Sequence, residues 1–79
     1  MIDYKTQISS NPNVMGGKPV IKDTRITVEL ILRKLADGYT TNEIVQMYPQ
    51  LTEENVLGSI AYAAAVIENE AVIDIDKAA

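Results

Sequence analysis

The chemistry available to this chain is limited by the absence of both histidine and cysteine from its sequence. That absence excludes disulfides, Cys/His zinc sites and imidazole acid-base catalysis. Carboxylates are paired at Glu53 and Glu54 and at Asp74 and Asp76, but neighbours along a helix do not face one another. The tripeptide Gly16-Gly17-Lys18 lacks the glycine spacing and the hydroxyl after the lysine that a P-loop needs. We therefore expect no enzyme activity, no cofactor, no metal site and no small-molecule substrate.

Lysine and arginine side chains remain as candidate contacts for phosphate groups. The chain has 11 acidic and 7 basic residues and a formal net charge of −4, whereas proteins that bind nucleic acids on their own are usually basic. The positive charge is concentrated near the N-terminus, and only Lys77 lies in the second half of the chain. The N-terminal cations are Lys5, Lys18, Lys22, Arg25, Arg33 and Lys34. Lys18, Lys22 and Arg25 are therefore the candidate contacts with the phosphates of DNA.

The segment that must position these three cations covers residues 16–28 and reads GGKPVIKDTRITV. Residues 20–21 and 25–27 have the composition of two short strands. Asp23 tolerates a positive φ, so Lys22 and Asp23 can close a tight turn between these strands. The segment is predicted to form a β-hairpin, with an irregular surface loop as the alternative.

A helical pattern begins at residue 28, immediately after this segment. The apolar residues that recur at helical spacing are Val28, Ile31, Leu32 and Leu35. Thr27 is positioned as the N-cap and Gly38 follows the last turn, which predicts a helix over residues 28–37. Thr40 and Glu43 have the spacing of a capping box, so a second helix is predicted over residues 41–48, where Pro49 ends it.

Thr52 is placed to cap a third helix that reaches about residue 68, with Glu53 and Glu54 in its first turn. Its expected apolar stripe consists of Val56, Leu57, Ile60, Ala63, Ala64 and Ile67. The second and third helices have the spacing of a helix-turn-helix, although two helices of an ordinary bundle have the same spacing. The candidate base contacts are Gln50, Asn55 and Ser59. The two glutamates at the start of this helix would repel phosphates.

A chain of this length hides only about 60% of the surface that its unfolded form exposes, so self-association is expected. The candidate dimer contacts are Val20, Ile21 and Ile26 in the hairpin and Tyr62 in the alanine-rich part of the third helix, where a place in the core is the alternative. An acidic and apolar tail follows that helix. Its candidate contacts with a basic partner protein are Glu68, Glu70, Val72, Ile73, Asp74, Ile75 and Asp76, with a solvated helix end as the alternative.

Several of these motifs occur together in one known family. They are Gly17-Lys18-Pro19-Val20-Ile21-Lys22, Thr24-Arg25-Ile26, Leu35-Ala36-Asp37-Gly38, Glu43-Ile44, Tyr48-Pro49, Leu51-Thr52 and Ala61-Tyr62-Ala63. With these motifs the chain resembles the small bacterial family called domain of unknown function four hundred thirty-three, which belongs with the Vap-type antitoxins. The resemblance covers residues 11–64, and Asp23 stands where glycine is expected most often.

The resemblance implies a homeodomain-like three-helix domain with an N-terminal β-hairpin, usually a dimer. It also implies the antitoxin half of a toxin-antitoxin pair, whose toxin is a PIN-like ribonuclease. Such antitoxins bind the toxin through one end and their own promoter through the other. We therefore expect an antitoxin-like homodimer that neutralises a PIN-like ribonuclease and binds operator DNA. A module that binds only proteins is the alternative.

The expected organisation is a single, mainly α domain over residues 1–79. It comprises an arm and hairpin (1–27, with residues 8–14 extended), a three-helix core (28–68) and a flexible tail (69–79). The chain starts without the apolar core of a signal peptide, and its longest apolar run, residues 60–67, is far shorter than the about 20 residues of a membrane span. We expect a soluble, cytoplasmic protein.

Overall fold

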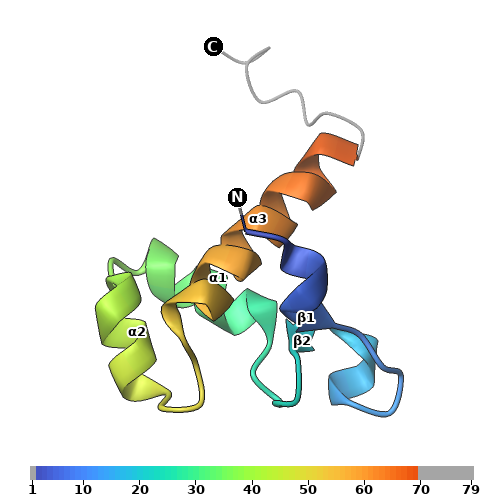
Figure 1. Cartoon of the computed structure of the whole chain (residues 1–79), viewed down its shortest axis with the longest axis horizontal. Helices are drawn as coiled ribbons and strands as arrows, with labels where there is room; N and C mark the ends of the chain where they lie inside the picture. Colours follow the sequence, from blue (N-terminus) through green and yellow to red (C-terminus); the bar gives the residue numbers. More distant parts are fainter. Residues whose placement is uncertain (1, 70–79) are drawn as a thin grey trace.

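Three α-helices, two short 3-10 helices (labelled η) and two short strands make up the computed structural model, which describes residues 2–69. In chain order the elements are η1 (Tyr4–Thr6), β1 (Ile8–Ser9), η2 (Met15–Gly17), β2 (Val20–Ile21), α1 (Val28–Ala36), α2 (Thr41–Met47) and α3 (Glu53–Asn69). Figure 1 shows η1 and the two strands on the side of α3 opposite α2. The mainly helical fold is confirmed. The predicted tail lies outside the described residues except for Asn69, the last residue of α3.

Local hydrogen bonds fix both ends of α1. The Thr27 hydroxyl accepts a hydrogen bond from the backbone N–H of Leu30 at 3.1 Å, so Thr27 is the N-cap that its position predicts. At the other end Gly38 has a φ of +97°. The N–H groups of Gly38 and Tyr39 donate to the carbonyls of Leu35 and Lys34 at 3.0 and 3.1 Å. This Schellman pattern ends α1 one residue before the predicted boundary.

Reciprocal caps begin the other two helices. In α2 the N–H of Glu43 donates to the Thr40 hydroxyl at 3.1 Å, and Glu43 Oε1 accepts from the Thr40 N–H at 2.8 Å. The same exchange starts α3, with an asparagine in place of the glutamate: the N–H of Asn55 donates to the Thr52 hydroxyl at 3.2 Å, and Asn55 Oδ1 accepts from the Thr52 N–H at 2.9 Å. Each cap satisfies two backbone donors that the helix leaves unpaired.

The sheet differs from the predicted hairpin. β2 pairs antiparallel with β1, where an extended arm was expected, with Ile8 opposite Ile21 and Ser9 opposite Val20. Residues 25–27 contribute a single bridge, between Val20 and Thr27. The reason is that Thr27 is already the N-cap of α1, so the chain must leave the sheet there.

The predicted tight turn after β2 is present. Asp23 has a φ of +65°, and the Thr24 N–H donates to the Ile21 carbonyl at 3.0 Å. The Thr24 hydroxyl donates to the same carbonyl at 2.8 Å and accepts from the Ile26 N–H at 3.0 Å. These bonds hold residues 22–25 as a compact loop between β2 and α1.

The core lies where β2 and the three helices meet. Its buried cluster consists of Ile21, Ile31, Ile44, Leu51 and Val56, with Ile8, Ile26, Leu35, Val45 and Tyr48 packed against it. Val20 and Ile21 are each only 2% exposed, which favours a place inside the single chain over the predicted dimer contact. Ile26 packs against the same cluster. The apolar side chains of the turn segment therefore stabilise the single chain.

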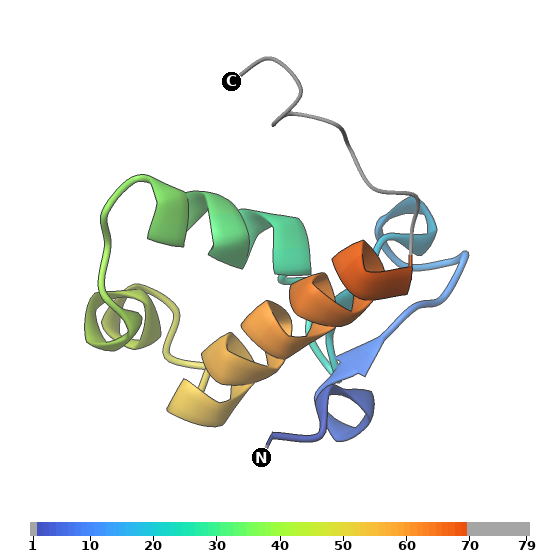
Figure 2. The same ribbon diagram turned by 90° about the horizontal axis from the view of Figure 1, so that it is seen from above.

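The buried face of α3 also differs from the predicted stripe. Val56 is fully buried as expected, but Leu57 and Ile60 are 40% and 42% exposed, and Gly58 and Ser59 are buried in their place. Figure 2 shows the cause: α3 crosses the molecule with α1 and α2 on one side and the N-terminal segment on the other. The contact with that segment covers the face that carries Gly58, where an added Cβ would lie 2.9 Å from Gln7 Cβ.

Candidate functional site

The three predicted phosphate contacts lie at different places. Lys18 Nζ forms an ion pair with Glu29 Oε1 at 3.3 Å, and Glu29 Oε2 accepts from both Nε and Nη2 of Arg33 at 3.1 and 2.9 Å. These partners, with the Arg33 hydrogen bonds as the main cause, hold the pKa of Glu29 below its ordinary value of 4.5. Lys22 and Arg25 are exposed in the turn after β2, and neither forms an ion pair within residues 2–69.

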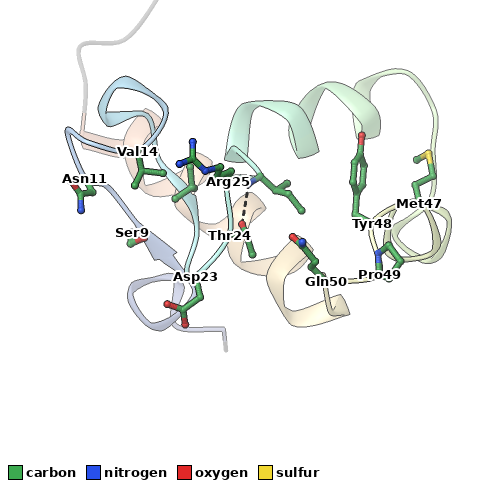
Figure 3. Close-up of a pocket in the computed structure, with 12 residues that line it drawn as sticks. Ser9, Asn11, Val14, Asp23, Thr24, Arg25, Met47, Tyr48, Pro49 and Gln50 are labelled. Atoms are coloured by element: carbon green, nitrogen blue, oxygen red, sulfur yellow. Dashed lines mark hydrogen bonds between the residues drawn. The ribbon is translucent and has the colours of Figure 1, made fainter.

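Arg25 and Gln50 line one open groove, which we call the Arg25 groove (Figure 3). It has a volume of about 820 Å³ and separates the turn after β2 from the connection between α2 and α3. Asp23 places a negative charge in the same groove. The remaining lining residues are Ser9, Asn11, Val14, Val20, Thr24, Ile26, Met47, Tyr48 and Pro49. Two of the six predicted DNA contacts are thus brought together.

The other two predicted base contacts have structural roles. Ser59 is fully buried, and its hydroxyl donates to the Asn55 carbonyl at 3.0 Å. Asn55 Nδ2 donates to Gln7 Oε1 at 2.6 Å, while its Oδ1 belongs to the α3 cap. Ser59 therefore cannot reach a base edge in this fold, and Asn55 ties the N-terminal segment to α3.

A second groove separates α1 from α3, and we call it the α1–α3 groove. It has a volume of about 450 Å³. Its lining is largely apolar and consists of Pro19, Val28, Leu32, Ala36, Tyr62, Ala63, Val66 and Ile67, together with the paired Glu29 and Arg33. Tyr62 also packs edge-on against the Tyr4 ring, with centroids 5.6 Å apart. This contact favours the alternative that Tyr62 belongs to the folded chain rather than to a dimer.

Beside this groove α3 exposes a row of apolar side chains, which we call the α3 row. Its members are Leu57, Ile60, Ala64 and Ile67, and Ile67 is 73% exposed. All four belong to the apolar stripe that the sequence predicts for this helix, and apolar residues at helical spacing usually face a core. Their spacing alternates between three and four residues, which is the pattern of a helix face that packs against another helix. This spacing was the feature of the sequence that could have indicated an exposed seam.

The predicted partner contacts fall mostly on residues that the structure does not cover. Glu68 is exposed in the last turn of α3. The remaining six candidates, Glu70, Val72, Ile73, Asp74, Ile75 and Asp76, lie outside the described residues. Within residues 2–69 no group of three or more acidic side chains is placed to hold a metal ion, and no helix has the length and apolar character to cross a membrane.

Comparison with known proteins agrees with this fold. The chain is 29% identical to Uncharacterized protein y4eO of Sinorhizobium fredii over 58 residues, which are 73% of this chain but only 26% of that protein. It superimposes on the crystal structure of a DUF433 member from Anabaena variabilis with a TM-score of 0.73 and 30% identity, covering 77% of this chain and 60% of that one. Residues 8–63 match the model of the family described as Protein of unknown function (DUF433). The chain belongs to the DUF433 family.

Proposed function

We propose that this protein is an antitoxin-like, cytoplasmic binding module that holds and neutralises a PIN-like ribonuclease through the α1–α3 groove. The observation that carries the proposal is the apolar lining of that groove, which continues into the exposed side chain of Ile67. Apolar surface left uncovered in a protein of this size is typical of a protein-protein contact. The nature of the partner comes from the resemblance to antitoxins.

The charge of the chain supports a basic partner. Its net charge is −4, and the sequence that follows α3 contains Glu70, Asp74 and Asp76. A ribonuclease must present a positive surface to RNA, and an acidic protein is drawn to such a surface by complementary charge. A contact that combines the α1–α3 groove with these carboxylates would cover the surface that the nuclease uses for its substrate.

Co-expression of the full chain with the product of its neighbouring gene, which the proposal expects to be a PIN-like ribonuclease, tests the proposal. We expect the two proteins to co-purify and the cells to survive expression of the nuclease. Leu32→Glu, in the α1–α3 groove, should weaken both effects, because a charge there is desolvated in the complex. Met47→Glu, on an α2 side chain that is 39% exposed, is the matched control and should leave both effects unchanged. Failure to co-purify would refute the proposal.

Removal of residues 71–79 tests the tail separately. If Val72, Ile73, Ile75 and the neighbouring carboxylates contact the nuclease, the shortened chain should neutralise it less completely. Full neutralisation by the shortened chain would remove the tail from the contact while leaving the α1–α3 groove in place.

A second candidate function is binding of operator DNA by a homodimer, with α2 and α3 acting as a homeodomain-like helix-turn-helix. The observation in its favour is that Arg25 and Gln50 line one groove, with Lys22 in the same turn as Arg25. The two cations would contact phosphates while the Gln50 amide reaches a base edge.

The test of this second function is the binding of the chain to its own upstream DNA at several salt concentrations, alone and with the nuclease. Arg25→Ala should weaken binding and lower the salt slope by about one, as expected for one lost phosphate contact. Light scattering on the same samples gives the oligomeric state. Absence of binding at low salt, with and without the nuclease, would exclude this function.

A further inference from the structure

The α3 row has the spacing of a helix-pairing seam. Leu57, Ile60, Ala64 and Ile67 follow one another at intervals of three, four and three residues, so they lie along one face of α3. Apolar residues at this spacing are the seam positions of two helices that pack side by side. Over ten residues the row is about 15 Å long, a little under three helical turns.

The rest of the fold leaves this face uncovered within residues 2–69. The other sides of α3 contact α1, α2, η1 and β1, as Figure 2 shows from above. Leu57, Ile60 and Ile67 retain 40%, 42% and 73% of their accessible surface, whereas Val56, one residue before the row begins, retains none. The α3 row also meets the α1–α3 groove at Ile67, so the two apolar surfaces are continuous.

The charged residues beside the α3 row indicate which kind of helix the row would bind. Glu53 lies four residues before Leu57, and Glu68 lies four residues after Ala64, so both carboxylates are in line with the row. The described part of α3 contains a third acidic residue, Glu54, and no lysine or arginine. A second copy of α3 would place carboxylates near carboxylates in either orientation. A helix with cations near its ends would instead complement them.

We propose that the α3 row receives an amphipathic helix of a partner protein, with apolar residues at heptad spacing and lysine or arginine near both ends. The small Ala64 leaves room for a large apolar side chain of that helix. The inference rests on the proposed function, because we take this helix to be part of the protein that is neutralised. It adds the chemistry of the recognised segment and places the contact on α3 itself.

A synthetic helix provides the test. The probe is a peptide of about 18 residues, or about five turns, with leucine at the seam positions and lysine near both ends. A matched peptide carries glutamate in place of each lysine. Titration of each peptide into the isotope-labelled full chain, followed by NMR, reports the dissociation constant and the amide groups that respond. We expect the lysine peptide to bind, with shifts at residues 57–67, and the glutamate peptide to bind about tenfold more weakly or not at all.

Variants locate the contact. Ile60→Glu and Ile67→Glu should each weaken binding of the lysine peptide by about tenfold or more. Tyr39→Glu, between α1 and α2 and exposed to nearly the same extent as Ile60, should leave binding unchanged. Circular dichroism of each variant verifies the fold, and Ile67→Glu is the safer substitution because its side chain is 73% exposed.

Four results would overturn the inference. The lysine peptide does not bind, or it binds no more tightly than the glutamate peptide. The α3 variants leave its binding unchanged. The chain is a dimer that Ile60→Glu converts to a monomer, which would identify a second copy as the occupant. The proposed function fails independently. A nuclease complex that tolerates Ile60→Glu but is lost with Leu32→Glu would refute this inference alone. Binding of the lysine peptide without a nuclease complex would refute the proposed function and leave the chemistry of the α3 row in place.

Discussion

At the scale of single residues, Gly58 and Asn55 decide how the N-terminal segment meets α3. Gly58 has no Cβ, which allows Cβ and Cγ of Gln7 to lie against the helix. Asn55 then holds the end of the same Gln7 side chain by a hydrogen bond of 2.6 Å. One glutamine side chain is therefore fixed at its base by packing and at its end by a polar bond.

Gly58→Ala should destabilise the protein although alanine is the better helix former. The new Cβ would lie 2.9 Å from Gln7 Cβ, which belongs to the base of that side chain and cannot turn away. Overpacking of about 1–3 kcal/mol should outweigh the gain in helix propensity of about 1 kcal/mol. Urea denaturation measures the difference, and Ala64→Gly at an exposed position of α3 measures the propensity effect alone. An increase in stability would contradict this packing.

Asn55→Ala should lower the free energy of unfolding by about 1–2 kcal/mol, because it removes half of the α3 cap and the bond to Gln7. Asn42→Ala, at an exposed position in the first turn of α2, is the matched control and should change little. Denaturant melts of the two variants check this difference. Equal effects would show that neither the cap nor the contact with Gln7 contributes to stability.

At the scale of elements, the start of α1 joins the turn segment to the helical part of the fold. Thr27 caps the helix, and Glu29 in the first turn bonds both Lys18, which precedes β2, and Arg33, one turn along α1. A carboxylate at this position also faces the positive end of the helix dipole. The charge of Glu29 thus stabilises α1 and its attachment to the preceding loop.

The lowered pKa of Glu29 predicts an acid dependence of stability. Because the folded-state value lies below the ordinary 4.5, the stabilisation is present above that pH and is lost as the pH falls through the folded-state pKa. The stability difference between the wild type and Glu29→Gln should therefore shrink between about pH 7 and about pH 3. Thermal melts across this range measure it, with Glu54→Gln at the start of α3 as the control. A difference independent of pH would contradict the role of this ion pair.

At the scale of the whole molecule, apolar and acidic surface are combined on one helix. The α3 row and the α1–α3 groove are continuous through Ile67. Within residues 2–69, the charged residues of α3 are all glutamates. The chain as a whole carries a charge of −4. The proposed contact with a basic protein would use apolar burial for affinity and charge for attraction at a distance.

Association with the proposed nuclease should accordingly be sensitive to salt. Raising the salt concentration from about 50 mM to about 500 mM should lower the association rate constant by about tenfold and change the dissociation rate constant less. Surface plasmon resonance with the immobilised nuclease separates the two rate constants. The double variant Glu53→Gln/Glu68→Gln should reduce the salt dependence, whereas Asp37→Asn, beyond the end of α1, should not. An association rate insensitive to salt would argue against charge attraction.

The sequence by itself determined the three helices and the tight turn at Asp23. Each depends on neighbours in the chain: the Thr40–Glu43 capping box and the Thr27 cap use bonds over three residues, and Gly38 supplies a local left-handed residue. Such local patterns can be recognised in the sequence, because they do not depend on where distant segments of the chain pack.

The tertiary structure decided which surfaces are covered. The pairing of β1 with β2, the contact of Gln7 with Gly58 and the shared groove of Arg25 and Gln50 each join segments more than ten residues apart. An apolar residue at helical spacing fits a core or an exposed seam equally well, so the predicted stripe did not separate the buried Val56 from the exposed Leu57 and Ile60. Only the packing of the N-terminal segment against one side of α3, and of α1 and α2 against the other, determines that the α3 row remains exposed.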